Sequence, residues 1–282
     1  MTLKLVLPKG RISVKVQELL GDCGIKFIGA DRDYRPKAIG YDFEVKLLKS
    51  QNIPGMVELG SHDIGFAGLD WIKETGSDVE ILKDLNFDPV KIVACIPEDW
   101  DFEEMKSRPL VVASEYKQIA SEYLENLGVN FNLLRAYGAT EVFPPEDADM
   151  IIDNTSTGST IKANRLKIVD TVMESGTQFI ANREAMADPG KRQAIEDLLM
   201  LMQSVLNGRE RVLLEMNVPN EQIEAIVELL PAMRYPTVAP LYRDQGFAVK
   251  AAVKKSEIRE LLPKLIATGA TDILETPIRK AL

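Results

Sequence analysis

Residues 148–164 read ADMIIDNTSTGSTIKAN. The apolar run Met150–Asp153 predicts a buried strand, and residues 161–164 predict a short helical turn. The residues between them are almost all small and hydroxyl-bearing. A strand that passes through a small-residue turn into a helix is the building unit of α/β proteins. Ligands of such proteins bind beyond the carboxyl ends of the strands. This stretch therefore predicts an α/β fold and a ligand site at the turn.

The turn itself is suited to a phosphate group. Its small residues let backbone N–H groups converge on an anion, the start of the following helix adds partial positive charge, and its hydroxyl groups can donate to phosphate oxygens. The turn lacks the lysine of a G-x-x-x-x-G-K-[ST] loop, so it is not a Walker A loop. The alternative is a polar surface loop that caps a helix. The predicted phosphate-binding residues are Asp153, Asn154, Thr155, Ser156, Thr157, Gly158, Ser159 and Thr160.

Strands and helices alternate on both sides of this stretch, which indicates βαβ units and a largely parallel sheet. The segment 30–40 is polar and rich in turn-forming residues. A helix with a core-facing stripe starts at Ile12, and further helices are predicted at 52–59, 116–127 and 190–208. The predicted strands are 3–7, 43–48, 64–68, 91–96, 109–114, 131–136, 150–153, 166–172 and 178–181.

The pattern changes after Gly208. A strand at 212–216, a helix at 221–230, strands at 237–241 and 247–253, a helix after Ser256 and a strand at 271–274 follow one another. This βαββαβ order is that of the ferredoxin-like motif. We expect Ser256 to cap the last helix and Pro263 to kink or break it. A domain boundary is expected near 207–211.

Composition excludes several functions. The chain has 282 residues, enough for two or three domains, and a net charge of −9, which argues against general nucleic-acid binding. The chain has a single histidine, His62, which nearly excludes a histidine-based catalytic triad or a metal site with several histidines. No apolar run approaches the ~20 residues that span a bilayer. Residues 1–30 show no signal segment, so no membrane association and a cytoplasmic location are expected.

Three further clusters carry chemistry at strand ends. Lys9 and Arg11 flank a glycine at a helix start, where cations are slightly unfavourable, and this hints at an anionic ligand. Gly65 and Gly68 leave room for the close approach of a backbone or a ligand. The alternative is that these glycines serve only the local backbone structure of the strand and its turns. Glu141, in GATEVFP, can bind a sugar hydroxyl or lie on plain surface.

Taken in order, these segments resemble the ATP phosphoribosyltransferase family. LVLPKGR, NIPGMVELGSHDIGFAG, GATEVFP and ADMIIDNTSTGSTIKAN carry the match, at 5–11, 52–68, 138–144 and 148–164. LLPAMRYPTVAPL, at 229–241, resembles the regulatory domain of the family's long form. Asn154 stands where the family often has an apolar residue, and Lys49 where it often has Arg. The resemblance implies a two-lobed, periplasmic-binding-protein-like core with lobes at 1–90 plus 181–208 and at 91–180, and a regulatory domain at 211–282.

The resemblance also implies a reaction. The family joins ATP to 5-phosphoribosyl 1-diphosphate and forms N1-(5-phospho-β-D-ribosyl)-ATP and diphosphate. Adenine N1 is unprotonated at neutral pH, so the nucleophile needs no general base. Catalysis must then come from positioning and from electrostatic stabilisation of the departing diphosphate. Mg²⁺ is the expected cofactor, held mainly by substrate phosphates.

The roles that the resemblance implies fall on the same clusters. The loop 153–160 would bind the donor, and histidine would inhibit from the C-terminal domain of a homo-oligomer in dimer–hexamer equilibrium. The catalytic candidates are Lys9, Arg11 and Asp153. The ATP-binding candidates are Lys9, Arg11, Lys49, Gly68 and Glu141. The histidine-binding candidates are Glu215, Met233, Tyr235, Thr237 and Leu274.

Two other functions are compatible with the same architecture. A solute-binding protein can have two such lobes, since fold does not fix function, but the hydroxyl-rich loop and the absent signal segment speak against it. A regulator without catalysis would need a DNA-binding module, which the acidic composition does not favour.

Overall fold

The computed structural model describes residues 2–29 and 33–282. Contacts divide the chain into two compact units. The first unit comprises Met1–Glu18 and Ile25–Glu196, and the second comprises Leu19–Gly24 and Asp197–Leu282. No helix of the described residues is both long and apolar enough to cross a membrane. The domain boundaries that the sequence suggests, 1–90 with 181–208, 91–180 and 211–282, stay a prediction.

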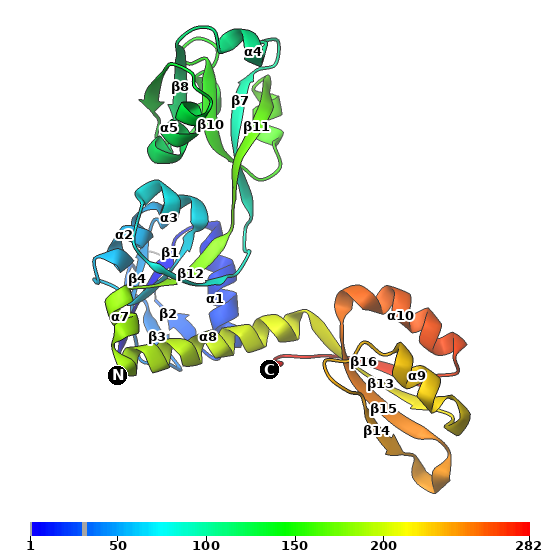
Figure 1. Cartoon of the computed structure of the whole chain (residues 1–282). Helices are drawn as coiled ribbons and strands as arrows, with labels where there is room; N and C mark the ends of the chain where they lie inside the picture. The colour runs from blue at the N-terminus through cyan, green and yellow to red at the C-terminus, as the bar shows by residue number, and fades with distance from the viewer. Residues whose placement is uncertain (1, 30–32) are drawn as a thin grey trace. The chain divides into compact units, whose positions relative to one another are not determined.

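The first unit contains two five-stranded sheets, and the first of them carries Lys9 and Gly68 at its strand ends. We call this sheet and its helices the first lobe. Its strand order is β4-β1-β5-β12-β6, and Figure 1 shows the returning strand β12 among the early strands. The strands are β1 (Leu3–Pro8), β4 (Phe43–Leu48), β5 (Ile64–Gly68), β6 (Glu80–Asp84) and β12 (Thr177–Ala181).

Helices follow the parallel strands of the first lobe. They are α1 (Arg11–Asp22), α2 (Ile53–Glu58) and α3 (Leu69–Thr75). β5 is buried along its whole length, as expected for a strand covered on both faces. Gly65 sits where α2 crosses it, and a Cβ there would lie 2.7 Å from Val6 Cγ1 and 3.0 Å from Ile53 Cγ2. Gly65 is therefore a packing requirement of this contact.

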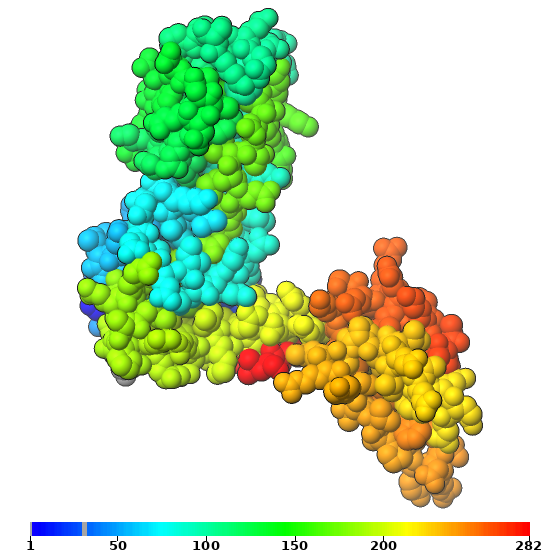
Figure 2. All heavy atoms as spheres, in the orientation of Figure 1, coloured from blue at the N-terminus to red at the C-terminus, as the bar shows by residue number. Residues whose placement is uncertain are grey.

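The second sheet carries the hydroxyl-rich turn, and we call it and its helices the second lobe. Its order is β11-β7-β10-β8-β9. Its core packs around the fully buried Tyr116, and Figure 2 shows the green residues of this lobe as one closely packed body. Its elements are β7 (Val90–Pro97), α4 (Phe102–Met105), β8 (Leu110–Ser114), α5 (Lys117–Asn126), β9 (Phe131–Arg135), η2 (Thr140–Val142), β10 (Met150–Thr155), α6 (Ser159–Ala163) and β11 (Leu166–Ser175).

The expectation of largely parallel sheets is wrong, because both sheets are mixed. Parallel pairs join β1 to β4 and β5, and β8 to β9 and β10. The antiparallel pairs recorded in these sheets all involve β7 or β12. Each of these is the first strand after the chain passes from one lobe to the other. No helix precedes either strand, so the crossover that makes neighbouring strands parallel is absent there.

Several local expectations also need correction. β10 continues to Thr155, so Asp153, Asn154 and Thr155 belong to the strand and the turn proper is 156–158. Part of the segment predicted as turn-rich forms a hairpin strand, β3 (Lys37–Ile39), paired with β2 (Lys26–Ile28), while residues 30–32 lie outside the described residues. A helix without a clear apolar stripe, α7 (Arg183–Ala187), precedes the long α8 (Pro189–Arg209).

The second unit has the ferredoxin-like order β14-β15-β13-β16. Alternate residues of β13 and β15 are buried under α9 and α10, which lie against the same face of the sheet in Figure 1. Lys254, rather than Ser256, is the N-cap of α10, and the helix runs on through Pro263 without ending. The elements are β13 (Arg211–Val218), α9 (Ile223–Leu229), β14 (Thr237–Pro240), β15 (Phe247–Lys254), α10 (Lys255–Ala267) and β16 (Thr271–Pro277). The predicted fold class, a two-lobed core of the periplasmic-binding-protein type followed by a βαββαβ domain, is confirmed.

Candidate active site

A cavity of about 190 Å³ is lined by residues of both lobes. We call it the cleft cavity. Lys9, Arg11 and Gly68 reach it from the ends of β1 and β5, and Asn154 reaches it from β10. The structure thus brings together two of the three cationic candidates, the glycine and one residue of the hydroxyl-rich segment. Their common position follows from topology, since the carboxyl ends of parallel strands meet at one edge of a sheet.

Lys9 and Arg11 start α1 from a tight turn. Gly10 between them has φ +87°, a conformation that glycine adopts without strain. The first turn of α1 contains no acidic residue, so nothing on the helix itself offsets the two cations. Lys9 Nζ lies 3.3 Å from the centre of the Tyr34 ring. Arg11 is exposed. The cations are therefore placed for an anionic ligand.

Asp153 is held in one orientation by its neighbours. Its Oδ1 accepts from the backbone N–H of Asn154 at 2.6 Å, and its Oδ2 accepts from the hydroxyl of Thr140 in η2. Burial raises the pKa of Asp153, the bonds from Thr140 and Asn154 lower it, and the nearby charge of Glu141 raises it further. Its raised pKa and its position at the end of β10 both make Asp153 a candidate site residue.

The turn after β10 is organised by its own hydroxyl groups. Thr155 Oγ1 accepts from the N–H of Gly158 at 2.9 Å, and the hydroxyls of Thr157 and Ser159 lie 3.0 Å apart. Gly158 has φ +73°, so a side chain there would be strained. α6 has five residues and aligns few peptide dipoles. The hydroxyl and N–H groups of the turn, rather than the helix, must therefore supply most of the attraction for a phosphate.

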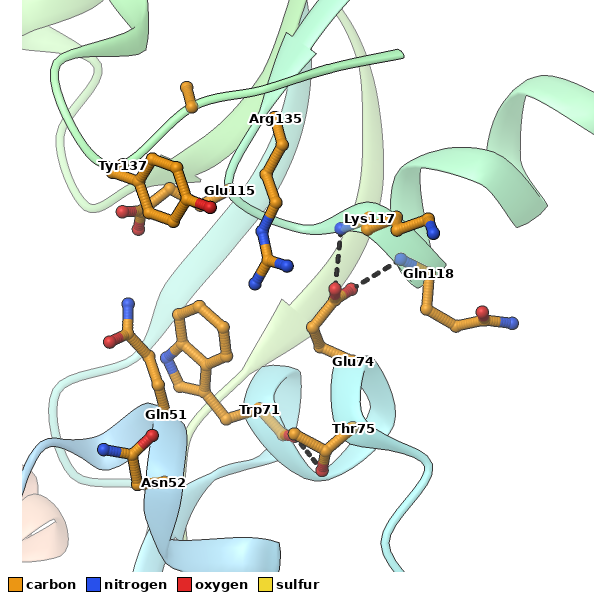
Figure 3. A pocket seen from close by; sticks show the side chains of 11 residues that line it. Gln51, Asn52, Trp71, Glu74, Thr75, Glu115, Lys117, Gln118, Arg135 and Tyr137 are labelled. Atoms are coloured by element: carbon orange, nitrogen blue, oxygen red, sulfur yellow. Dashed lines mark hydrogen bonds between the residues drawn. The ribbon is translucent and has the colours of Figure 1, made fainter.

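A second cavity, of about 500 Å³, adjoins the first through Trp71, which lines both. Figure 3 shows Arg135, Tyr137 and Glu115 on one side of it and Gln51, Asn52 and Trp71 on the other. Burial raises the pKa of Glu115, as does the charge of Asp153, while Lys49 and Arg135 lower it. The cavity combines aromatic rings with charges of both signs.

Sequence reasoning missed the residues of this second cavity. Arg135 and Tyr137 stand directly before GATEVFP, and Trp71 follows Gly68 by three positions. Their place at the ends of predicted strands was the available signal. Lys49 and Glu141 line neither cavity, but Lys49 acts electrostatically on Glu115 and Glu141 acts on Asp153.

The candidate regulatory residues lie on the sheet face opposite the helices of the second unit. Strand register places Leu274, Glu215, Lys250 and Thr237 in one row across the sheet, and Glu215 and Lys250 form an ion pair. A cavity of about 500 Å³ is lined by Met233, Tyr235, Thr237 and Lys250, among others. Three of the five candidates therefore share a cavity, while Glu215 and Leu274 lie beside it.

The described residues contain no group of three or more His, Cys, Asp or Glu side chains that could hold a metal ion. Asp153 stands directly before the hydroxyl-rich turn, and the nearby charge of Glu141 raises its pKa. Mg²⁺ typically binds one or two carboxylates and completes its shell with substrate phosphates and water. The donor set at the turn fits such an ion.

Comparison with known proteins identifies the family. A family model described as ATP phosphoribosyltransferase matches residues 49–204, and one described as the HisG C-terminal domain matches residues 208–280. The ATP phosphoribosyltransferase of Chlorobium phaeovibrioides is 39% identical over 99% of this chain and 97% of its own length. That of Pelotomaculum thermopropionicum is 36% identical, and the match covers both chains completely.

A solved structure agrees with these relatives. The ATP phosphoribosyl transferase (HisG:HisZ) complex from Thermotoga maritima contains a chain that matches 71% of this one and 96% of its own length. The TM-score is 0.64 and the sequence identity is 25%. The likeness to curated relatives runs through the C-terminal domain as well as the two lobes. The chain belongs to the ATP phosphoribosyltransferase family, in its long form.

Proposed function

We propose that this enzyme transfers the phosphoribosyl group of 5-phosphoribosyl 1-diphosphate to N1 of ATP, with diphosphate as the second product. One observation carries the proposal: the strand that leads into the hydroxyl-rich turn opens into the same cavity as Lys9 and Arg11. A pair of cations and Asn154, which leads into the phosphate-binding turn, at one cavity match a reaction between two polyanions. Both substrates must be aligned before the ribosyl C1 can meet its nucleophile.

The turn would bind the ribose 5-phosphate. The hydroxyls of Thr157 and Ser159 already face each other, and the loop keeps further hydroxyls on exposed residues. Asp153 would accept from the ribose hydroxyls through Oδ2, which already accepts from Thr140 and can accept a second hydrogen bond. A negative charge fixed beside the ribose also favours the oxocarbenium-like transition state.

Lys9 and Arg11 would meet the diphosphate or the triphosphate of ATP. Two cations that line the cavity would stabilise the charge that builds up as the diphosphate departs. Lys49 and Glu141 would act through their charges on Glu115 and Asp153. Gly68 would serve the nucleotide site by leaving room for the Asp70 carboxylate, which fills the space that a Cβ would take. Mg²⁺ would offset phosphate charge, with Asp153 and Glu141 as its carboxylate ligands, directly or through water.

The proposed chemistry needs no protein base. N1 of adenine attacks with its own lone pair. His62, the single histidine, is buried, and burial and the charges of Lys46 and Lys4 lower its pKa. It lines neither cavity of the first unit. The residues at the cleft therefore bind, orient and stabilise, and none has to move a proton.

Histidine would act as a feedback inhibitor through the second unit. A free amino acid carries a carboxylate and an ammonium group, and Lys250 and Glu215 offer the complementary charges beside the cavity of Met233, Tyr235 and Thr237. Such inhibition requires the ligand to prefer one global state of an assembly. We propose a dimer–hexamer equilibrium for that assembly and a cytoplasmic location for the enzyme.

A turnover assay tests the whole proposal. The protein is mixed with ATP, 5-phosphoribosyl 1-diphosphate and Mg²⁺, with and without histidine, and product formation is followed by ultraviolet absorbance. We expect product without histidine and a lower rate with it. No product, with either substrate still bound, would favour a binding protein of the same architecture. If product forms at the same rate with and without histidine, the proposed reaction is supported and the proposed regulation is contradicted.

A further inference from the structure

The first turn of α5 is held by a helix of the other lobe. The carboxylate of Glu74, in α3, accepts from the backbone N–H groups of Lys117 at 2.6 Å, Gln118 at 2.9 Å and Ile119 at 3.1 Å, and Figure 3 shows two of these bonds. Tyr116, the N-cap residue, provides no side-chain cap of its own. Its ring instead packs 4.8 Å from that of Trp71. The two lobes are thus joined at this helix end.

Asp70, one turn before Glu74, forms the buried part of the same contact. It is 5% exposed. Its Oδ1 accepts from the hydroxyl of Ser175 at 2.7 Å, and its Oδ2 accepts from the hydroxyl of Tyr116 at 2.8 Å. Burial, together with the charge of Asp70, raises the pKa of Tyr116. The phenol therefore keeps its proton and donates it to Asp70.

The phenol oxygen has a second partner on the other side. Asn154 Nδ2 donates to it at 3.1 Å and also lies 3.1 Å from Asp153 Oδ1. Because the only proton of Tyr116 is used by Asp70, its oxygen must accept, and the amide of Asn154 must point its NH₂ group inward. A directional chain of hydrogen bonds results, from Asn154 through Tyr116 to Asp70.

This chain ends at the start of the proposed donor loop. We propose that Tyr116 and Asp70 are positioning residues for 5-phosphoribosyl 1-diphosphate, which fix Asn154 and Asp153 where β10 enters the loop and tie that loop to the first lobe. The inference rests on the proposed function and deepens it. Asn154, predicted to bind the donor, has its amide turned to Tyr116 and acts through the position of Asp153 and the turn.

The test compares substrate preferences of variants. Tyr116→Phe removes the hydroxyl and keeps the ring on Trp71, and Asn154→Ala removes the same bond from its exposed end. For each, KM for the donor is expected to rise roughly tenfold, the effect of losing a hydrogen bond in a charged network, and KM for ATP is expected to rise much less. The double variant should resemble the single ones, because both changes break one chain.

Two further variants separate this role from simpler ones. Tyr123→Phe removes a hydroxyl of the same helix that donates to Asp170 Oδ2 at 3.0 Å, away from both cavities, and the ratio of the two KM values should not change. Glu74→Ala loosens the contact between lobes without touching the chain and should raise both KM values by a similar factor. If Glu74→Ala raised KM for the donor much more than KM for ATP, the effect would come from the contact between the lobes, and the inference would be overturned.

Two other results would overturn the inference. One is that Tyr116→Phe and Asn154→Ala have additive effects on KM for the donor. The other is that Tyr116→Phe, like Tyr123→Phe, leaves the ratio of the two KM values unchanged. Calorimetric titration of each variant with the donor alone gives the same comparison without turnover. A wild-type chain that binds the donor but makes no product contradicts the proposed function, whereas the binding ratios still decide the role of Tyr116. The Tm of Tyr116→Phe shows whether this variant folds. If it does not, Asn154→Ala still tests the same hydrogen bond.

Discussion

The cleft of the first unit and the open sheet face of the second unit are built differently. In and beside the cleft cavity, polar groups are fixed before any ligand arrives: Asp153 is held by Thr140 and Asn154, and Asp70 by Tyr116 and Ser175. On the open face, Tyr235 and Leu274 are largely exposed, Met233 is partly exposed, and one ion pair joins Glu215 to Lys250. Preorganised dipoles lower a reaction barrier, while exposed groups gain order only when a ligand covers them. The contrast matches catalysis in one place and regulation in the other.

The largest expected effect comes from breaking the fixed turn. Thr157→Ala combined with Gly158→Val removes a hydroxyl and puts a branched side chain at φ +73°. We expect KM for the donor to rise roughly a hundredfold, because left-handed backbone strain and a lost hydrogen bond each cost about 1–2 kcal/mol. Steady-state kinetics measure it. Gly128→Val, at φ +69° in the same lobe but away from the turn, should lower Tm alone. Kinetics near those of the wild type would remove the loop from the donor site.

Loss of a cation at the cleft should have the next largest effect. Arg11→Ala is expected to raise KM for ATP or the donor about tenfold, with a smaller change at high salt, because exposed charges are screened within about 10 Å at 0.1 M ionic strength. Arg192→Ala removes an exposed cation that pairs with Glu196 and is the matched control. A change of Tm without any change in KM would make Arg11 structural.

Histidine binding at the open sheet face of the second unit can be tested by removing the charge of Lys250. Lys250→Ala should weaken inhibition by histidine about tenfold, as expected for an exposed ligand contact with a charged group. Lys254→Ala, four residues further along the same strand and on the same face, should not change the inhibition constant. Equal loss of inhibition in both variants would point to a general effect of net charge and not to a site.

The smallest effect expected is on stability. Asp153 has its pKa raised above the ordinary aspartate value of about 3.9. Relative to the unfolded chain, the folded state therefore favours the protonated form, and the stability this gives is present below that ordinary value and is lost as pH rises through the folded pKa. Asp153→Asn should raise Tm slightly at neutral pH, with no gain at acid pH. A lower Tm at neutral pH would show that the carboxylate stabilises the fold.

Local patterns predicted most elements of this protein, though not α3 or β6, and they did not predict the directions of the strands. The run Met150–Ile152 and the alternation of Phe247, Val249, Ala251 and Val253 place side chains on definite faces, because strand periodicity is a property of neighbouring residues. The reversal of β7 and β12 has no such signal. It follows from the passage of the chain between lobes, which depends on how whole sheets pair.

By itself, the sequence determined the α/β class, the ferredoxin-like order and the hydroxyl-rich turn between strand and helix, because each is written in residues close together along the chain. Only the tertiary structure decided that Asp70, Tyr116 and Asn154 form one chain of hydrogen bonds, and that Trp71 faces Arg135 across a cavity. These partners lie 38 or more positions apart. Such contacts form only after loop closure and burial have fixed both backbones, and no local period records them.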